Sequence, residues 1–208
     1  MKRLRRFLLR LGVVILVLGA AVLGLYWYQR GPGLAREVAR LSALVEFRQG
    51  MTVADVGAGK GRMAVLVAKR LGAGGRLYAT EIDAGKVEAI QRAAEEDGLG
   101  NVVTIHSGPR STGLSDGCCD VVYLRRVYHH FSDREAMLRG LHAAVRPGGR
   151  LAVIDLPSPR WLFFLRHGIR ADDLTRQVTA AGFVLERRVD GWSPIDYCVV
   201  FRKPAARD

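Results

Sequence analysis

The sequence predicts a single α/β domain, built on a doubly wound, mostly parallel sheet of seven strands with one antiparallel strand and preceded by a transmembrane helix. Three observations support this. From residue 52 onward short apolar runs alternate with segments of helical periodicity, the last two runs have no helix between them, and residues 11–28 carry no charge. Alternating strands and helices form a parallel sheet covered on both faces, and a closing hairpin adds one antiparallel strand.

Length and charge limit the domain count and the kind of partner. The chain has 208 residues, 49% of them hydrophobic, and a formal net charge of +12. This length suffices for one core after a short extension, so we expect an amino-terminal segment over residues 1–30 and one domain over residues 31–208. About half of the positive excess precedes residue 31. A nucleic-acid face would place basic residues on the folded domain, so we expect a membrane surface and no nucleic acid as partner.

The uncharged run at residues 11–28 is interpreted as an uncleaved, single-pass membrane anchor. As a helix it would be about 27 Å long, close to the hydrocarbon thickness of a bilayer. Aromatic residues at 26–28 end the run where an interfacial belt would lie, and Arg10 precedes it. Two alternatives stay open, namely a cleaved signal peptide with small residues at 19–21 and a buried helix of the domain.

The elements after the anchor follow from breakers and periodicity. The Gly-Pro-Gly cluster at residues 31–33 ends the first helix, and helical spacing of apolar residues predicts a second helix over residues 34–47. Predicted strands cover residues 52–56, 76–81, 102–105, 120–124, 150–155, 183–189 and 197–201. Predicted helices cover residues 63–71, 86–97, 132–145 and 172–181. Ser132 and Glu135 have the spacing of a capping box for the third of these helices.

The three cysteines carry no predicted chemistry. Cys118 and Cys119 are adjacent and Cys198 is distant, which matches neither a metal-ligand spacing nor a disulfide framework. We interpret them as small apolar residues in or beside strands and expect no metal site.

A glycine-rich loop at residues 55–61 follows the first predicted strand. A Walker loop would need a glycine where Ala54 stands and a Ser or Thr where Gly61 stands. The dinucleotide fingerprint would need its third glycine where Arg62 stands. The spacings therefore exclude both. What remains is an acid followed by alternating glycines, namely Asp55, Gly57, Gly59 and Gly61.

Residues 50–61 resemble the first motif of class I S-adenosylmethionine-dependent methyltransferases, which have a Rossmann-like fold, and the resemblance covers about residues 50–204. It implies S-adenosylmethionine as cofactor. Glycines let the backbone approach the methionine part, and the amides of the following helix start face its carboxylate. Residues 77–83 are similar to the second strand of the family, whose terminal acid, Glu81 here, binds the ribose hydroxyls. Ile82 would face the adenine, and Asp83 would cap the next helix.

One part of the cofactor site departs from the family pattern. The family often has an acidic residue after the third strand, near the adenine, whereas this chain reads His-Ser-Gly-Pro at residues 106–109. Gly108, with Ser107, is the substitute that we expect there. The resemblance thus implies a cofactor site made of Asp55, Gly57, Gly59, Gly61, Glu81, Ile82 and Gly108.

Residues 128–131 lie between the fourth predicted strand and a helix, at the sheet edge where open α/β folds bind ligands. His129 or His130, and Asp155 at the end of the fifth strand, are the candidates for taking a proton from an oxygen or nitrogen acceptor. Loop packing is the alternative for the histidines. The preceding Arg125 and Arg126 are interpreted as one residue with a buried stem and one solvated residue, not as a clamp.

The acceptor is expected to be a small-molecule or lipid-like compound. Residues 160–166 combine aromatics with flanking arginines where the family often builds its acceptor pocket, and such a segment is compatible with a bilayer interface. The positive-inside rule places the domain outside, against a cofactor made in the cytoplasm, so the side of the membrane stays open. The alternative function is a catalytically weak or inactive binding or scaffold domain. A nucleic-acid methyltransferase would need a basic face and an acceptor motif.

Overall fold

The computed structural model describes the backbone of residues 2–30, 32–158 and 168–205, and the side chains of residues 10–24, 33–158 and 168–205. The chain divides into two compact units, Met1–Leu41 and Ser42–Asp208. The sequence-based boundary at residue 31 stays a prediction. Residues 160–166, where we expected an acceptor pocket, lie outside the described residues.

The amino-terminal unit contains α1 (Lys2–Arg30) and most of α2 (Pro32–Val45). The predicted transmembrane helix is wrong. Within the described residues, no helix combines the length and the apolar character that crossing a membrane requires. The expected anchor, the single-pass membrane localisation and the membrane as partner are corrected accordingly.

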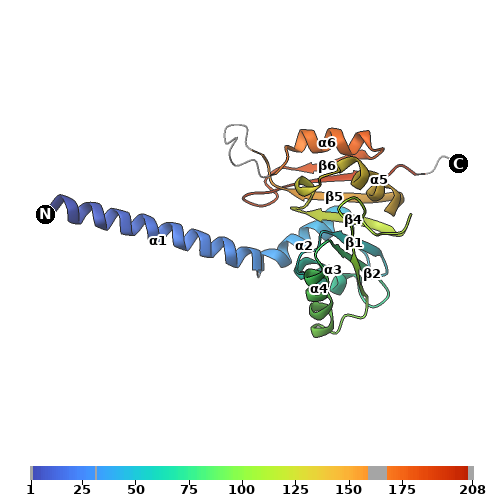
Figure 1. The fold of residues 1–208 in the computed structure, drawn as a ribbon, viewed down its shortest axis with the longest axis horizontal. Helices are drawn as coiled ribbons and strands as arrows, with labels where there is room; N and C mark the ends of the chain where they lie inside the picture. Colours follow the sequence, from blue (N-terminus) through green and yellow to red (C-terminus); the bar gives the residue numbers. More distant parts are fainter. Residues whose placement is uncertain (1, 31, 159–167, 206–208) are drawn as a thin grey trace. The chain divides into compact units, whose positions relative to one another are not determined.

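The second unit is built on one seven-stranded sheet, in the order β3-β2-β1-β4-β5-β7-β6 (Figure 1). The strands are β1 (Thr52–Val56), β2 (Arg76–Glu81), β3 (Val102–His106), β4 (Cys119–Arg125), β5 (Val145–Asp155), β6 (Val184–Val189) and β7 (Tyr197–Arg202). Neighbours from β3 to β5 pair in parallel, whereas β7 runs antiparallel to both β5 and β6. The predicted sheet, with its single antiparallel strand, is confirmed.

Helices cover the two faces of this sheet. They are α3 (Arg62–Leu71), α4 (Ala84–Glu96), α5 (Arg134–Ala144) and α6 (Ala171–Ala180), with a short 3-10 helix η1 (Tyr128–His130). The apolar stripes of α5 and α6 pack with β1, β4, β5 and β7 in one buried cluster, while α3 and α4 contact β2 and β3. This winding in two directions from β1 and β4 brings the carboxyl ends of both strands to the centre of one sheet edge.

Aspartates cap the helices that follow β2 and η1. The Asp83 carboxylate accepts the Lys86 amide at 3.1 Å, as the sequence predicts. For α5 the cap is Asp133, whose carboxylate accepts the Ala136 amide at 3.0 Å, and not the predicted Ser132. An ionised carboxylate is a strong acceptor at a helix start, which explains why the chain enters the helix one residue later.

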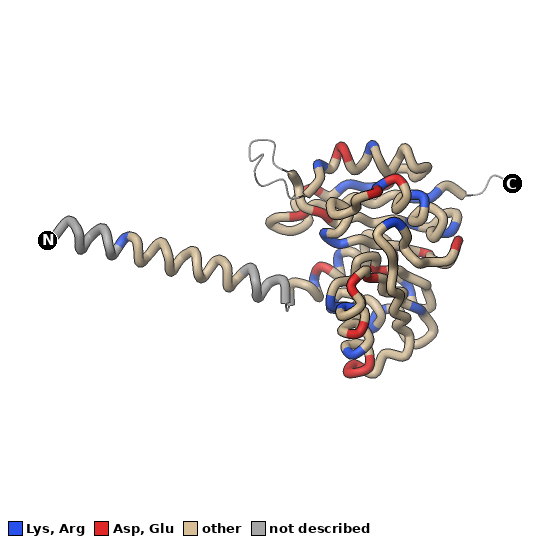
Figure 2. Tube along the Cα trace, in the orientation of Figure 1, with Lys and Arg blue, Asp and Glu red and all other residues tan. Residues whose placement is uncertain are grey.

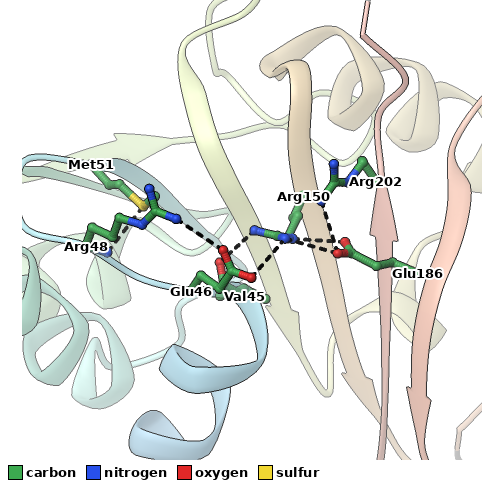
Figure 3. A network of polar contacts seen from close by, with 7 residues as sticks. All are labelled: Val45, Glu46, Arg48, Met51, Arg150, Glu186 and Arg202. Carbon is green, nitrogen blue, oxygen red and sulfur yellow. Dashed lines mark hydrogen bonds and ion pairs between the residues drawn. The ribbon is translucent and has the colours of Figure 1, made fainter.

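Charges on the folded unit are interspersed (Figure 2). An extended polar network centres on Arg150, whose side chain is 14% exposed (Figure 3). Its guanidinium donates to both carboxylate oxygens of Glu186, at 2.9 and 3.0 Å, and to the Val45 carbonyl at 3.3 Å. Glu46 and Arg202 extend the network. It joins the end of α2 to β5, β6 and β7, at the sheet edge opposite the carboxyl ends of the parallel strands.

Candidate active site

The glycine loop after β1 is tied to the end of β2 by backbone hydrogen bonds. The amides of Gly57 and Ala58 both donate to the carbonyl of Thr80, at 2.9 and 3.0 Å. The Gly59 amide donates to the Glu81 carboxylate at 2.9 Å. Because β1 and β2 are parallel neighbours, these bonds hold the loop at their common carboxyl edge.

Two glycines of the loop are required by close contacts as well as by backbone angle. Gly57 has a φ of 76°, and a Cβ there would lie 2.5 Å from Val127 Cγ2. Gly61 has a φ of 74°, and a Cβ there would lie 3.1 Å from three atoms of Ile90. At Gly59, by contrast, a Cβ would have no heavy atom of the described residues within 4 Å. The loop therefore opens to space at Gly59 and packs against protein on either side.

Glu81 organises this loop from the end of β2. The residue is 6% exposed. Its Oε2 accepts the Gly59 amide and its Oε1 accepts the Ile82 amide at 3.0 Å, while the Lys86 ammonium lies 3.9 Å away. The same carboxylate that the resemblance assigns to the ribose hydroxyls thus also sets the shape of the loop.

Asp55 lies at the centre of the sheet, on the strand that leads into the loop. It is 2% exposed, and the Tyr123 hydroxyl from β4 donates to its carboxylate at 2.8 Å. Burial raises the pKa of Asp55 to about 7, against the lowering effects of the Tyr123 hydrogen bond and the Arg125 charge. Sequence reasoning missed Tyr123, although a phenol within an otherwise apolar buried strand is a signal that it needs a partner.

Ile82 and Gly108 flank the end of β2. The Ile82 side chain is 61% exposed, which is unusual for an isoleucine, and its carbonyl lies 3.0 Å from His106 Nε2. The Ser107 amide donates to the Glu81 carbonyl at 2.9 Å, so the turn at Gly108 is held beside the same strand end. These contacts bring the two predicted adenine-side residues to one place.

His129 and Asp155 form a pair at the ends of β4 and β5. His129 Nδ1 lies 2.6 Å from Asp155 Oδ1, and its amide donates to Asp155 Oδ2 at 3.2 Å. The two side chains are 6% and 0% exposed. Asp155 also accepts the Leu156 amide at 2.7 Å. The His130 ring is exposed and lies 3.9 Å from the His129 ring, centroid to centroid.

The short helix η1 that carries these histidines is anchored at Tyr128. The Tyr128 hydroxyl donates to the Gln177 side chain in α6 at 2.8 Å, and its ring packs on Phe131. Burial raises the pKa of Tyr128 to about 12. Tyr128 therefore serves as a neutral anchor for η1.

A cavity of about 390 Å³ lies at the end of β5. It is lined by Pro157, by residues 170–172 at the start of α6, by Arg188, and by residues 190–191 and 193–197 of the loop between β6 and β7. Tyr197, one of the lining residues, is the strand partner of Asp155, whereas His129 and Asp155 themselves are not among the lining residues. A second cavity, of about 480 Å³, lies where α3 and α4 end, at the opposite sheet edge.

The Arg126 side chain is 18% exposed, and its guanidinium donates to Asp196 Oδ1 and Oδ2 at 2.8 and 2.7 Å. The interpretation of Arg125 and Arg126 as one residue with a buried stem and one solvated residue stays a prediction. Sequence reasoning also missed Asp196, because 70 residues separate the partners. No local pattern at either position signals the contact.

Comparisons with known proteins identify a methyltransferase domain. A family model described as a methyltransferase domain matches residues 54–153. Nocamycin O-methyltransferase of Saccharothrix syringae is 33% identical over 152 residues, which cover 70% of this chain and 54% of that protein. The ubiquinone/menaquinone biosynthesis C-methyltransferase of Klebsiella pneumoniae is 25% identical over 113 residues, which cover 54% of this chain and 45% of that protein. The chain thus spans about half the length of these relatives.

Solved structures share the architecture. A SAM-dependent methyltransferase from Aquifex aeolicus superposes with a TM-score of 0.73 at 22% identity, covering 80% of this chain and 89% of that one. Geranyl diphosphate C-methyltransferase from Streptomyces coelicolor, solved with S-adenosyl-L-homocysteine, gives a TM-score of 0.69 at 13% identity, covering 81% and 80%. At these identities the likeness shows the fold.

Proposed function

Because the chain belongs to the class I S-adenosylmethionine-dependent methyltransferase family, we propose that it transfers a methyl group from S-adenosylmethionine to a small, uncharged acceptor. One observation carries this proposal. The glycine loop held by Glu81 and the pair of His129 and Asp155 lie at the same sheet edge, and Val127, two residues before His129, touches Gly57 of the loop. A cofactor group and a proton-accepting group therefore adjoin each other.

The residues of the cofactor half fit S-adenosylmethionine. That compound supplies an electrophilic methyl group on a sulfonium. The open side of Gly59 admits the methionine part, and the first amides of α3 face its carboxylate. Glu81 accepts the ribose hydroxyls with its remaining lone pairs, and Ile82 offers an exposed apolar surface to the adenine. Asp55 favours the cofactor ammonium once its carboxyl ionises, and Gly108 leaves room beside the adenine.

His129 takes the proton of the acceptor, and Asp155 positions the His129 ring. A neutral imidazole that donates Nδ1–H to Asp155 carries its lone pair on Nε2. Asp155 is fully buried and already accepts three hydrogen bonds, from the His129 ring and amide and from the Leu156 amide. It is therefore suited to fixing the ring rather than to meeting an acceptor. His130 is the second candidate base, since its ring is exposed beside His129.

The cavity at the end of β5 is the proposed acceptor site. Its charged lining is balanced: Arg188 pairs with Asp172 and Asp190, Arg170 pairs with Asp172, and Asp196 pairs with Arg126. A lining without uncompensated charge favours an uncharged molecule, including one with a lipid-like skeleton. Relatives named for methylating nocamycin or for ubiquinone and menaquinone biosynthesis support small organic acceptors.

A titration tests the proposal. S-adenosyl-L-homocysteine and S-adenosylmethionine are titrated calorimetrically into the full chain, with Gly59→Val and Glu81→Ala beside it. We expect micromolar binding and losses of about tenfold or more in both variants, because one closes the open side of the loop and the other removes the carboxylate that shapes it. Absence of binding by the unmutated chain would remove the enzyme proposal.

A second function, a methyltransferase-like binding domain without turnover, is favoured by one observation. Ser107 and Gly108 stand where the family often has an acid beside the adenine. Radiolabelled S-adenosylmethionine with fractionated small-molecule extract separates the two functions. Label transfer that disappears in His129→Gln supports the enzyme, and cofactor binding without transfer to any fraction supports the binding domain.

A further inference from the structure

Arg126 occupies an unusual backbone position at the end of β4. Its φ of 57° lies in the left-handed region, which a residue with a Cβ adopts only when the surrounding structure enforces it. Its amide donates to the Ile154 carbonyl of β5 at 2.7 Å. Three residues later comes His129, so this bend decides where η1 begins.

The Arg126 side chain makes the most enclosed bidentate ion pair among those described. Its Nε and Nη2 lie 2.8 and 2.7 Å from the two oxygens of Asp196, and the side chains are 18% and 0% exposed. The Ser193 hydroxyl donates to the same carboxylate at 2.6 Å. Ser193 Oγ in turn accepts the Ile195 amide at 3.2 Å. The loop before β7 is therefore folded around the carboxylate that Arg126 holds.

An ion pair this deeply buried adds little net stability, because desolvating both charges offsets their attraction. What it does enforce is geometry, since a bidentate fork admits one relative orientation. The two loops that it joins both reach the proposed site. One carries His129, and the other lines the acceptor cavity and leads into Tyr197, the strand partner of Asp155.

We infer that Arg126 is a positioning residue, which with Asp196 holds the His129 imidazole against Asp155 and fixes the cavity wall at residues 193–196. A role of Arg126 in catalysis rests on the proposed function. The coupling of the ion pair to His129 and to the loop at residues 193–196 can be measured without an acceptor.

The test compares two arginines that make similar bidentate pairs. Arg126→Gln removes the pair at the carboxyl edge, and Arg150→Gln removes the pair with Glu186 at the opposite edge. Nitrogen-15 NMR of the histidine rings reports the tautomer and hydrogen bonding of His129; the chain has only 5 histidines, and His129→Asn identifies the signal. Hydrogen exchange at the Ile195 and Ser193 amides reports the loop, and titration of S-adenosyl-L-homocysteine reports the cofactor half.

We expect Arg126→Gln to change the ring nitrogen-15 shifts of His129 and to accelerate exchange at Ile195 by about tenfold or more, while cofactor affinity stays within about twofold. Arg150→Gln leaves both signals as in the unmutated chain. Arg126→Lys, which keeps the charge but not the fork, falls between them, and Asp196→Asn reproduces the changes from the other partner. Asp196→Asn also provides the measurement if Arg126→Gln does not fold.

Two results would overturn the inference. One is an unchanged set of His129 ring nitrogen-15 shifts in Arg126→Gln and in Asp196→Asn. The other is an equal change in Arg150→Gln, which would mean that any loss of stability disturbs the histidine. Failure of the unmutated chain to bind S-adenosyl-L-homocysteine would remove the proposed function instead, and the histidine signals would still decide the role of Arg126.

Discussion

The two halves of the sheet build their sites in different ways. In the half from β1 to β3, proposed to bind the cofactor, backbone groups mainly fix the geometry of the loop. Loop amides donate to the Thr80 carbonyl and the Glu81 carboxylate, and two glycines lie so close to Val127 and Ile90 that no side chain would fit. In the half from β4 to β7, proposed to bind the acceptor, paired side chains fix the geometry, as in His129 with Asp155 and Arg126 with Asp196. Backbone geometry suits a constant ligand, whereas side chains can change with the acceptor.

The largest expected effect is a loss of methyl transfer without a change in cofactor affinity. His129→Gln should lower methyl transfer by roughly 10²–10⁴-fold, because the proton acceptor is lost, and leave the affinity for S-adenosyl-L-homocysteine unchanged. Steady-state kinetics and calorimetry on one preparation measure both. His130→Gln is the matched neighbour and should have a much smaller effect. The reverse ranking would transfer the role of base to His130.

The next largest expected effect is a loss of cofactor affinity. Gly57→Ala places a Cβ 2.5 Å from Val127 at a φ of 76°, so the loop must shift. We expect cofactor affinity to fall by about tenfold or more, corresponding to at least about 1.4 kcal/mol. Gly74→Ala, where nothing described lies within 4 Å and φ is not positive, is the control. Equal affinity in both variants would show that the loop tolerates the contact.

The pH dependence of stability tests the role of Asp55, at the end of β1. The pKa of Asp55 rises from 3.8 to about 7 on folding, so between these values the folded state binds more protons than the unfolded state. Stability therefore falls as pH rises through this window, by on the order of 4 kcal/mol at most, and stays low above about pH 7. In Asp55→Asn this loss should be absent. Unfolding by urea at pH 5 and pH 8 gives the comparison, and parallel pH profiles for both proteins would contradict the assignment.

The smallest expected effect compares two neighbouring residues at the start of α5. Asp133→Ala removes the cap of the Ala136 amide and should lower the free energy of unfolding by about 1 kcal/mol. Ser132→Ala should change it by only a few tenths. Thermal unfolding of the two variants checks this difference. A larger loss in the serine variant would restore the cap that the sequence suggested.

The same contrast explains what could be predicted. The strands, the glycine loop and Glu81 follow from local patterns, since a turn and its neighbouring strand end lie close together in the chain. Arg126 with Asp196 and Tyr123 with Asp55 join positions about 70 residues apart, and charge or hydrophobicity at one position does not name the other. His129 and Asp155 were candidates, but only the register of β4 and β5 pairs them.

Two errors came from reading a segment in isolation. The uncharged run of α1 was judged as a membrane span from its composition. Ser132 and Glu135 matched a capping pattern, yet Glu135 pairs with Arg139 one turn later and leaves the cap to Asp133. For the cap, a carboxylate one residue along the chain decided the outcome.

The antiparallel direction of β7 has a consequence for how acceptor recognition can evolve. Because β7 returns between β5 and β6, the turn that precedes it arrives at the working edge without being a link between parallel strands. Replacements at the exposed residues 191, 194 and 195 of this turn are therefore expected to leave every strand pair in place. Because the Ser193 hydroxyl and Asp196 tie this turn to Arg126, we expect changes confined to its exposed residues, such as Pro194, to alter the wall of the proposed acceptor cavity while the chain keeps its fold and its affinity for the cofactor.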